Sequence, residues 1–302
     1  MTGLLLALIA AVAHARSDVV ILKSDSLDAY QAPIERFRSA LGRPTTVYDL
    51  MGKRERADAL ARQLAADPPP LVFALGAKAA YVAAHKLPNV PLVHAMVINP
   101  ARYGVGGTQV TGVSTDVAAD TALSQFKLFA PKVERLGVLL AASNTGPGTQ
   151  GALDSARLLG YELNVQRVTN PRDLRAAWDR IASEVDALWL IPDPVVLNPE
   201  GYRYLHGETR RRKLPILATT EALVHAGAFM CVAPNRENVG QQAADLAIRI
   251  LDGGELPGII PLAEPSEVRV VLNRATLETL GLEVDMALLD FVDEIVEDPR
   301  GR

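Results

Sequence analysis

Residues 184–255 decide the fold: EVDALWLIPDPVVLNPEGYRYLHGETRRRKLPILATTEALVHAGAFMCVAPNRENVGQQAADLAIRILDGGE. This stretch holds three short apolar runs, at Ala187–Ile191, Pro215–Ala218 and Ala228–Ala233, with helical patterns between them. Such runs predict strands that are buried on both faces of a parallel sheet. Polar residues follow the first two runs directly. Ligands of open α/β sheets bind outside the carboxyl ends of the strands, so these polar residues are candidates for a small-molecule site.

The same alternation of strand and helix runs through the rest of the chain in two blocks. The first block has predicted strands at residues 18–22, 45–49, 71–75, 91–97 and 109–113. The second starts with a helix at 120–129 and has predicted strands at 135–141, 162–168, in the quoted stretch, and at 267–273. Alternation of this kind indicates parallel sheets with right-handed crossovers. We therefore predict an α/β protein of two doubly wound parallel-sheet lobes, with residues 285–302 as a C-terminal helical tail.

The N-terminus predicts export. Leu4–Val12 is an apolar run too short to span a bilayer, and Ala13-His14-Ala15 after it forms a small-x-small cleavage pattern. We therefore expect Met1–Ala15 to be a signal peptide and the mature chain to be periplasmic. No cysteine lies near the cleavage point, so a lipid anchor is not expected. An ordinary buried N-terminal helix is the alternative, although no polar face accompanies the apolar run.

Composition argues against several classes of function. The 302 residues are 49% hydrophobic but only 5% aromatic, so few rings are available to stack on nucleic-acid bases. The net charge of −4 shows no basic excess, which argues against nucleic-acid binding. The single cysteine, Cys231, lies in an apolar strand and has no partner for a disulfide or a metal site. We expect it to be a small buried hydrophobic side chain, and we expect no cofactor.

Two motifs resemble enzyme signatures. Residues 146–151, GPGTQG, match the G-x-G-x-x-G of dinucleotide-binding folds. The first glycine lies several residues past the strand, however, and Pro147 removes one donor N–H. A flexible loop, or a helix N-terminus that holds an anionic group, is the better interpretation. Ser124–Lys127 matches S-x-x-K without companion motifs, so no nucleophile is paired with a base, and we predict that the chain is not an enzyme.

Four segments together resemble one known family. They are GTQVTGVSTDV at 107–117, APKVERLGVLLAASN at 130–144, the stretch quoted first, and EVRVVLNRATLETLGLEV at 267–284. In order and spacing they are similar to the ABC-transporter substrate-binding family related to tryptophan- and tyrosine-binding proteins. The similarity covers almost all of residues 18–284.

The resemblance implies a type I periplasmic binding fold, in which two lobes joined by three crossover strands close by a hinge on a ligand in the cleft between them. On that template the crossovers lie at Ser114–Asp116, Ala233–Asn235 and Pro265–Val268. Lobe 1 is then residues 16–114 plus 235–266, and lobe 2 is residues 115–234 plus 267–284.

The implied function is that of a periplasmic solute-binding protein of an ABC importer, which binds a small molecule. Its implied partner is an ABC permease in the inner membrane with its ATPase. Two alternatives stay open: a ligand-sensing periplasmic protein that reports to a membrane receptor, and a nucleotide-dependent enzyme on the same fold.

Several residues depart from the family pattern. Family members usually carry a small hydroxyl residue after the glycine of the third strand, where this chain has Ala77 and then Lys78. Pro194 replaces an amide or hydroxyl residue after Asp193, and Thr219-Thr220 stands where a Ser-Asp pair is common. We therefore expect a less polar pocket, whose ligand need not be that of any relative.

Residues at the predicted strand ends are the candidate ligand contacts, although each has a structural alternative as a helix cap or part of a turn. The candidates in lobe 1 are Ser24, Asp25, Ser26, Gly76, Met96 and Asn99, and those in lobe 2 are Ser143, Asn144, Asp193, Thr220 and Glu221. Asp193, flanked by Pro192 and Pro194, is expected to present a rigid carboxylate to a ligand amine. An acidic side chain and a helix N-terminus together favour an amino acid or a similar small zwitterion as the ligand.

Overall fold

The computed structural model describes residues 16–297, so the predicted signal peptide, Met1–Ala15, lies outside the described residues. The chain divides into two compact units. Unit 1 consists of Met1–Ser114 and Arg236–Ala263, and unit 2 consists of Thr115–Asn235 and Glu264–Arg302. The chain therefore passes between the units three times, and each unit is assembled from two separate segments.

Unit 1 is built on a five-stranded, wholly parallel sheet with the strand order β2-β1-β3-β4-β5. The interior strands are buried apolar runs, whereas the edge strand β2 carries polar residues and is only partly buried. The strands are β1 (Val19–Lys23), β2 (Thr45–Asp49), β3 (Val72–Leu75), β4 (Leu92–Ala95) and β5 (Val110–Gly112). The helices are α1 (Gln31–Leu41), α2 (Arg54–Ala66), α3 (Ala77–Lys86) and α9 (Arg236–Leu251), with short 3-10 helices η1 (Asp28–Tyr30), η2 (Pro100–Tyr103) and η4 (Pro257–Ile259).

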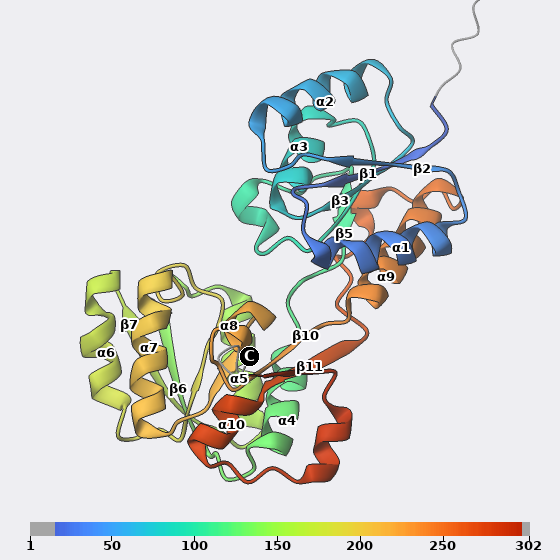
Figure 1. The fold of residues 1–302 in the computed structure, drawn as a ribbon. Coiled ribbons are helices and arrows are strands. Elements are labelled where there is room, and N and C mark those ends of the chain that lie inside the picture. The colour runs from blue at the N-terminus through green and yellow to red at the C-terminus, as the bar shows by residue number, and fades with distance from the viewer. Residues whose placement is uncertain (1–15, 298–302) are drawn as a thin grey trace, which may run out of the picture. The chain divides into compact units, whose positions relative to one another are not determined.

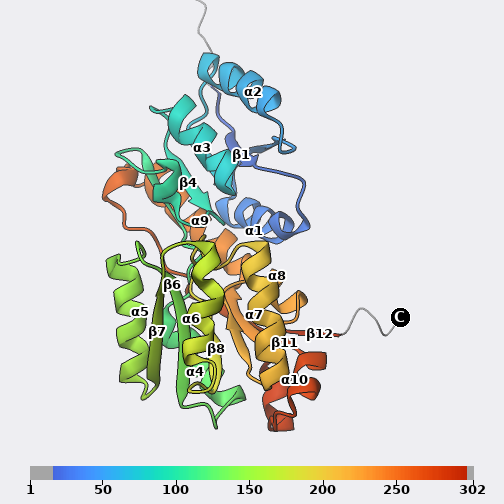
Figure 2. The same cartoon turned by 90° about the vertical axis from the view of Figure 1, so that its left-hand side faces the viewer.

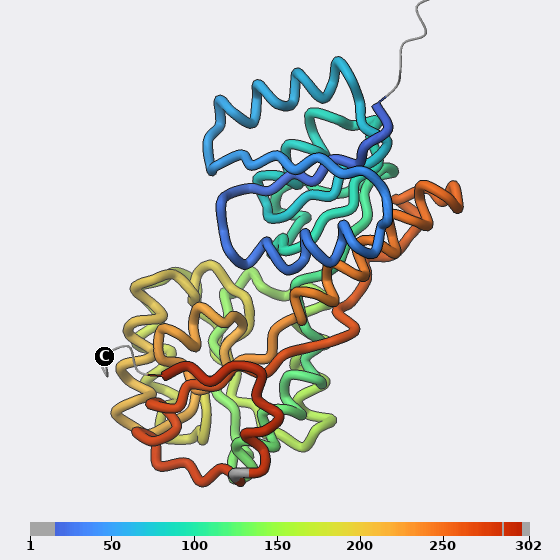
Figure 3. The backbone as a smooth tube through the Cα atoms, turned by 45° about the vertical axis from the view of Figure 1, so that its right-hand side comes forward, coloured from blue at the N-terminus to red at the C-terminus, as the bar shows by residue number. Residues whose placement is uncertain are grey.

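Both faces of this sheet are covered by helices. The side chains of α1 and α9 pack on one face, and those of α2 and α3 pack on the other. Helix α9 comes from the late segment of the chain and lies beside α1, as the orange and blue segments show (Figures 1 and 3). Gly240 allows this close approach, because a Cβ atom there would lie 2.4 Å from the carbonyl oxygen of Pro33. The helix therefore belongs to unit 1 despite its late position, as the resemblance implied.

Unit 2 is built on a seven-stranded sheet with the order β12-β11-β10-β9-β8-β6-β7, in which only the β10–β11 pair is antiparallel. The strands are β6 (Arg135–Ala141), β7 (Glu162–Val168), β8 (Ala187–Trp189), β9 (Ile216–Ala218), β10 (Met230–Pro234), β11 (Val268–Asn273) and β12 (Glu294–Val296). The helices are α4 (Ala119–Phe129), α5 (Pro147–Leu158), α6 (Leu174–Ile181), α7 (Pro199–Arg212), α8 (Glu221–His225) and α10 (Arg274–Leu280), with 3-10 helices η3 (Pro171–Asp173) and η5 (Met286–Phe291).

The helices of unit 2 also form two layers around the sheet. Apolar side chains of α6, α7 and α8 share one core, and those of α4, α5 and α10 share the core on the other face. Figure 2 shows α6 and α7 side by side along the sheet. The prediction of a two-lobed α/β protein with mainly parallel sheets is thus confirmed.

Two predictions about local structure are wrong. The predicted helical tail at residues 285–302 is instead the short 3-10 helix η5 followed by strand β12, which pairs in parallel with β11. The glycine-rich loop predicted over residues 143–151 is partly helical, because α5 begins at Pro147. Proline suits the first helical position, where its missing N–H would have had no partner within the helix. No described helix is both long enough and apolar enough to cross a membrane.

Candidate functional site

The carboxyl edge of the unit 1 sheet gathers several of the predicted residues. Ser24 follows β1 and is buried, and its hydroxyl oxygen accepts a hydrogen bond of 2.9 Å from the backbone N–H of Ala79 in the first turn of α3. Gly76 follows β3 with φ +84°, and a Cβ atom there would lie 2.8 Å from Ser24 Oγ and 2.2 Å from the hydroxyl of Tyr30. Ser24, Gly76 and Tyr30 therefore form one tight cluster beside the start of α3.

Tyr30 is a member of this cluster that sequence reasoning missed. Burial raises the pKa of its phenol, although a hydrogen bond with the Ser24 side chain acts in the opposite direction. The hydroxyl is thus held as a neutral group at physiological pH, because a free tyrosine already ionises only near pH 10. Its position at the end of a 3-10 helix before α1 gave no sequence signal for a role at the strand ends.

Asp25 and Ser26 lie beside the cluster and are exposed. The Asp25 carboxylate accepts a hydrogen bond of 2.8 Å from the backbone N–H of Ser26, and the Ser26 hydroxyl donates to Asp49 Oδ2 at 2.6 Å. Asp49 also pairs with Lys23, at 3.0 Å. Burial alone would raise the pKa of Asp49, but its hydrogen bonds and the Lys23 charge lower it overall. Asp25 is therefore the exposed carboxylate at this edge, whereas Asp49 is balanced by a cation.

Met96 and Asn99 adopt the left-handed backbone region, with φ of +57° and +50°. Such residues are uncommon outside glycine and gather at functional and strained sites. Met96 follows β4 directly and is half-buried at the sheet edge. Asn99 lies further along the loop, where its side chain accepts a hydrogen bond of 3.3 Å from the backbone N–H of Arg102. Asn99 thus caps η2, which is the structural alternative named for this class of residue.

Asp193 does not offer a free carboxylate, contrary to the prediction. Its residue is only 3% exposed. Oδ2 accepts hydrogen bonds from the Ala141 N–H at 2.7 Å and from the Asn144 side-chain amide at 3.0 Å. Oδ1 accepts from the N–H groups of Val195 and Val196, at 2.9 and 3.2 Å. The carboxylate therefore fastens the loop after β8 to the end of β6 and caps its own turn.

Asn144 belongs to the same bracket. Its side-chain oxygen accepts from the Thr149 hydroxyl at 2.6 Å, which ties the loop to the first turns of α5. Ser143, one residue earlier, is exposed on that loop. Gly146 precedes α5 without a side-chain cap, so the G-x-G-x-x-G match is a loop and a helix start. Asn144 and Asp193 are thus brought together as predicted, although they bind each other.

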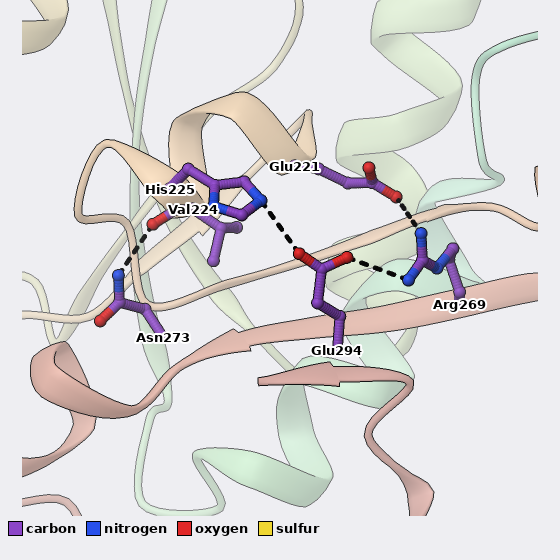
Figure 4. Close-up of polar contacts among 6 residues, drawn as sticks. All are labelled: Glu221, Val224, His225, Arg269, Asn273 and Glu294. Atoms are coloured by element: carbon purple, nitrogen blue, oxygen red, sulfur yellow. Dashed lines mark hydrogen bonds and ion pairs between the residues drawn. The ribbon is translucent and has the colours of Figure 1, made fainter. Parts of the chain in front are cut away.

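Thr220 and Glu221 lie apart from that bracket, at the start of α8. Thr220 precedes the helix and makes no side-chain cap hydrogen bond. Glu221 pairs with Arg269 at 3.0 Å, and Arg269 also pairs with Glu294 at 3.0 Å (Figure 4). Glu294 in turn contacts His225 at 3.0 Å. The Glu221 carboxylate therefore belongs to an ionic network that ties α8 and β11 to β12.

Arg269 is the second residue that sequence reasoning missed. A charged residue in the otherwise apolar run EVRVVLN was the available signal. Cys231 lies near this network and is buried, and burial raises the pKa of its thiol to about 12. The thiol therefore stays protonated, which agrees with the expected role of a small hydrophobic side chain. Among residues 16–297, no group of three or more His, Cys, Asp or Glu side chains is arranged to hold a metal ion.

Comparisons with known proteins point to one family. A family model described as ABC transporter substrate binding protein matches residues 47–296. A tyrosine-binding protein of Clostridioides difficile (strain R20291) is 24% identical over 232 residues, which are 74% of this chain and 66% of that protein. The activity and partners of that whole protein are therefore not carried over directly.

Solved structures show the same fold. A ligand-free, open substrate-binding protein with adhesive properties from Clostridium difficile has a TM-score of 0.73 at 22% identity, covering 93% of this chain and 99% of that one. An ABC domain in complex with L-Trp from Streptococcus pneumonia has a TM-score of 0.63 at 19% identity, covering 93% and 100%. The expected type I periplasmic binding fold is confirmed.

Proposed function

The chain belongs to the ABC transporter substrate-binding protein family, and we propose that it is a periplasmic solute-binding protein that delivers an amino acid, or a similar small zwitterion, to an ABC importer. The cluster at the carboxyl edge of unit 1 carries this proposal. There, the exposed Asp25 carboxylate lies next to Ser24, which is bonded to the first turn of α3. An acidic group suits a ligand ammonium, and a helix N-terminus suits a ligand carboxylate.

The relatives agree with this choice of ligand class. One is named for tyrosine binding and another was solved in complex with L-Trp. Ala77 and Lys78 replace the usual hydroxyl residue after Gly76, so a ligand side chain would meet a different wall in this protein. We therefore propose the amino-acid backbone as the recognised part and leave the ligand side chain to be determined. On this proposal the protein performs no chemistry on its ligand.

Calorimetric titration with the free amino acids tests the proposal. Each amino acid that binds is compared with its deaminated and decarboxylated analogues, such as indole-3-propionate and tryptamine for tryptophan. The Asp25→Asn variant should bind the amino acid about tenfold to a hundredfold more weakly, because a charge-assisted hydrogen bond is lost. It should bind the deaminated analogue as the original protein does.

Asp28→Asn is the matched control, because Asp28 is also an exposed acid, three residues later in η1. Its affinity for the amino acid should be unchanged. If no amino acid binds while another class of solute does, the amino-acid proposal fails and the solute-binding proposal survives. If Asp25→Asn and Asp28→Asn weaken binding equally, Asp25 is not the ammonium partner.

A further inference from the structure

Unit 2 contains a pocket at the edge of its sheet opposite to the strand ends discussed above. Ile216, which begins β9, and Phe229, which precedes β10, form its apolar floor, and Asn273, which ends the antiparallel strand β11, lies beside them. The second half of α7, the end of α8 and helix α10 form the walls. Its volume is about 210 Å³, which suits a compact molecule. All lining residues belong to unit 2.

The wall of this pocket is fixed by hydrogen bonds. Asn273 is buried, its amide donates to the Val224 carbonyl at 2.9 Å, and its side-chain oxygen accepts from the Thr276 N–H at 2.9 Å. The Thr276 hydroxyl donates to the Gly227 carbonyl at 3.0 Å. Figure 4 shows Asn273 directed at Val224. A pocket held in one geometry before binding loses little entropy on binding.

Gly227 shapes one side of the pocket. Its φ of +104° favours glycine, and a Cβ atom there would lie 2.4 Å from His206 Nε2. The imidazole of His206 is thus held against Gly227 on one side and stacks on Tyr202, with ring centroids 5.9 Å apart. Burial lowers the pKa of His206, and the nearby Arg210 charge lowers it further against a hydrogen bond with the Gly227 backbone. His206 is therefore neutral at pH 7.

One cation of this pocket has no counter-ion. None of the described lining residues is Asp or Glu, and no ion pair of Arg210 is found within residues 16–297. His225 also lines the pocket, but its Nε2 is turned toward Glu294 at 3.0 Å (Figure 4). Arg210 is thus an exposed guanidinium at the rim of a largely apolar cavity, in the last turn of α7. Its fork of donors matches a carboxylate.

We propose that this pocket is a second ligand site, which binds a compact monocarboxylate with an apolar body. The carboxylate pairs with Arg210, and the apolar body lies against Phe229, Ile216 and Leu280. A single cation favours a monoanion over a phosphate dianion, whose second charge would be left uncompensated in the cavity. The site lies at the other end of the unit 2 strands from the predicted ligand residues, so it does not depend on the function proposed above.

Nuclear magnetic resonance of the ¹⁵N-labelled mature protein tests this site, with benzoate as the probe and benzamide as its uncharged match. Benzoate should shift the amide signals of Gly227 and Thr276 in a saturable manner. The Arg210→Gln variant should weaken benzoate binding by about tenfold or more, since the charge-assisted pair is lost. Benzamide should bind the original protein about as weakly as benzoate binds that variant.

Arg211→Gln is the matched control, because this neighbouring exposed arginine pairs with Glu208 and does not line the pocket. It should leave benzoate binding unchanged. Thr279→Phe, at an exposed lining position, should fill the mouth and abolish binding while the melting temperature is kept. The proposal is overturned if Gly227 and Thr276 do not shift at millimolar benzoate, if benzamide binds as well as benzoate, or if Arg211→Gln weakens binding as much as Arg210→Gln.

Discussion

Replacing Asp193 by alanine should cost stability rather than ligand affinity. The carboxylate is almost fully buried and receives four hydrogen bonds, three from backbone N–H groups and one from Asn144. Alanine removes every acceptor and leaves these donors facing a small void. Removing one partner of a buried, hydrogen-bonded charge costs about 3–5 kcal/mol, and we expect a loss of that size in the free energy of unfolding of unit 2.

Asp193→Asn should cost less, about 2 kcal/mol. Its remaining oxygen still accepts from Val195 and Val196, whose N–H groups cap the turn. The new amide nitrogen, however, faces the Ala141 N–H, which is itself a donor. Two donors that meet cannot form a hydrogen bond, so the tie between β8 and β6 is lost while the cap survives. The order alanine, asparagine, original protein is therefore expected for stability.

Tryptophan fluorescence during urea unfolding measures this effect in the correct unit. The chain has two tryptophans, Trp178 and Trp189, and both are buried in unit 2. Asp154→Ala, which removes a half-exposed acid on α5, is the control and should change the free energy of unfolding by less than about 0.5 kcal/mol. The reasoning is refuted if Asp193→Ala unfolds like the original protein but binds its ligand tenfold more weakly.

Three further predictions concern other parts of the chain. Burial lowers the pKa of His94 to about 4, so the unfolded chain binds the extra proton between pH 6.5 and 4. Stability should therefore fall by about 3 kcal/mol as pH drops through that window, and urea unfolding followed by circular dichroism should show a flatter profile for His94→Phe. Gly240→Ala should cost about 1–3 kcal/mol through its clash with α1, whereas Gly207→Ala, in open space on α7, should not destabilise in the same assay. Mass spectrometry of the exported protein should find Arg16 first, and recovery of intact Met1 would contradict cleavage after Ala15.

The elements of the fold were predictable because their signals are local. Buried apolar runs gave β1, β3, β6 and β10 to within about two residues, since strand period and burial are written in adjacent side chains. Strand β12 was missed because three residues carry no period of their own. Its pairing with β11 depends on contacts between Val271 and Glu294 that no local pattern contains. Hinge closure on a ligand stays a prediction.

The candidate site was predictable in its location more than in its roles. Strand ends were the correct places for Ser24 and Gly76, which do meet at one edge. The tyrosine that completes their cluster, Tyr30, comes from a helix start whose distance from that edge is set by packing of the whole unit. Glu221 was identified from its position after a strand, but its counter-ion Arg269 lies in a strand 48 residues later. Pairs of that separation need the sheet order, which the sequence pattern does not provide.

Asp193 shows why a polar residue at a strand end is ambiguous in sequence. A loop that follows a buried strand must satisfy several backbone N–H groups that have left the sheet, and a carboxylate is the strongest acceptor for them. A ligand ammonium needs the same acceptor in the same place. The donors decide between the two roles: four protein donors already surround Asp193, whereas the exposed Asp25 receives one, from the backbone N–H of Ser26. The unused acceptor capacity therefore lies on unit 1, and that is where a ligand amine should be sought.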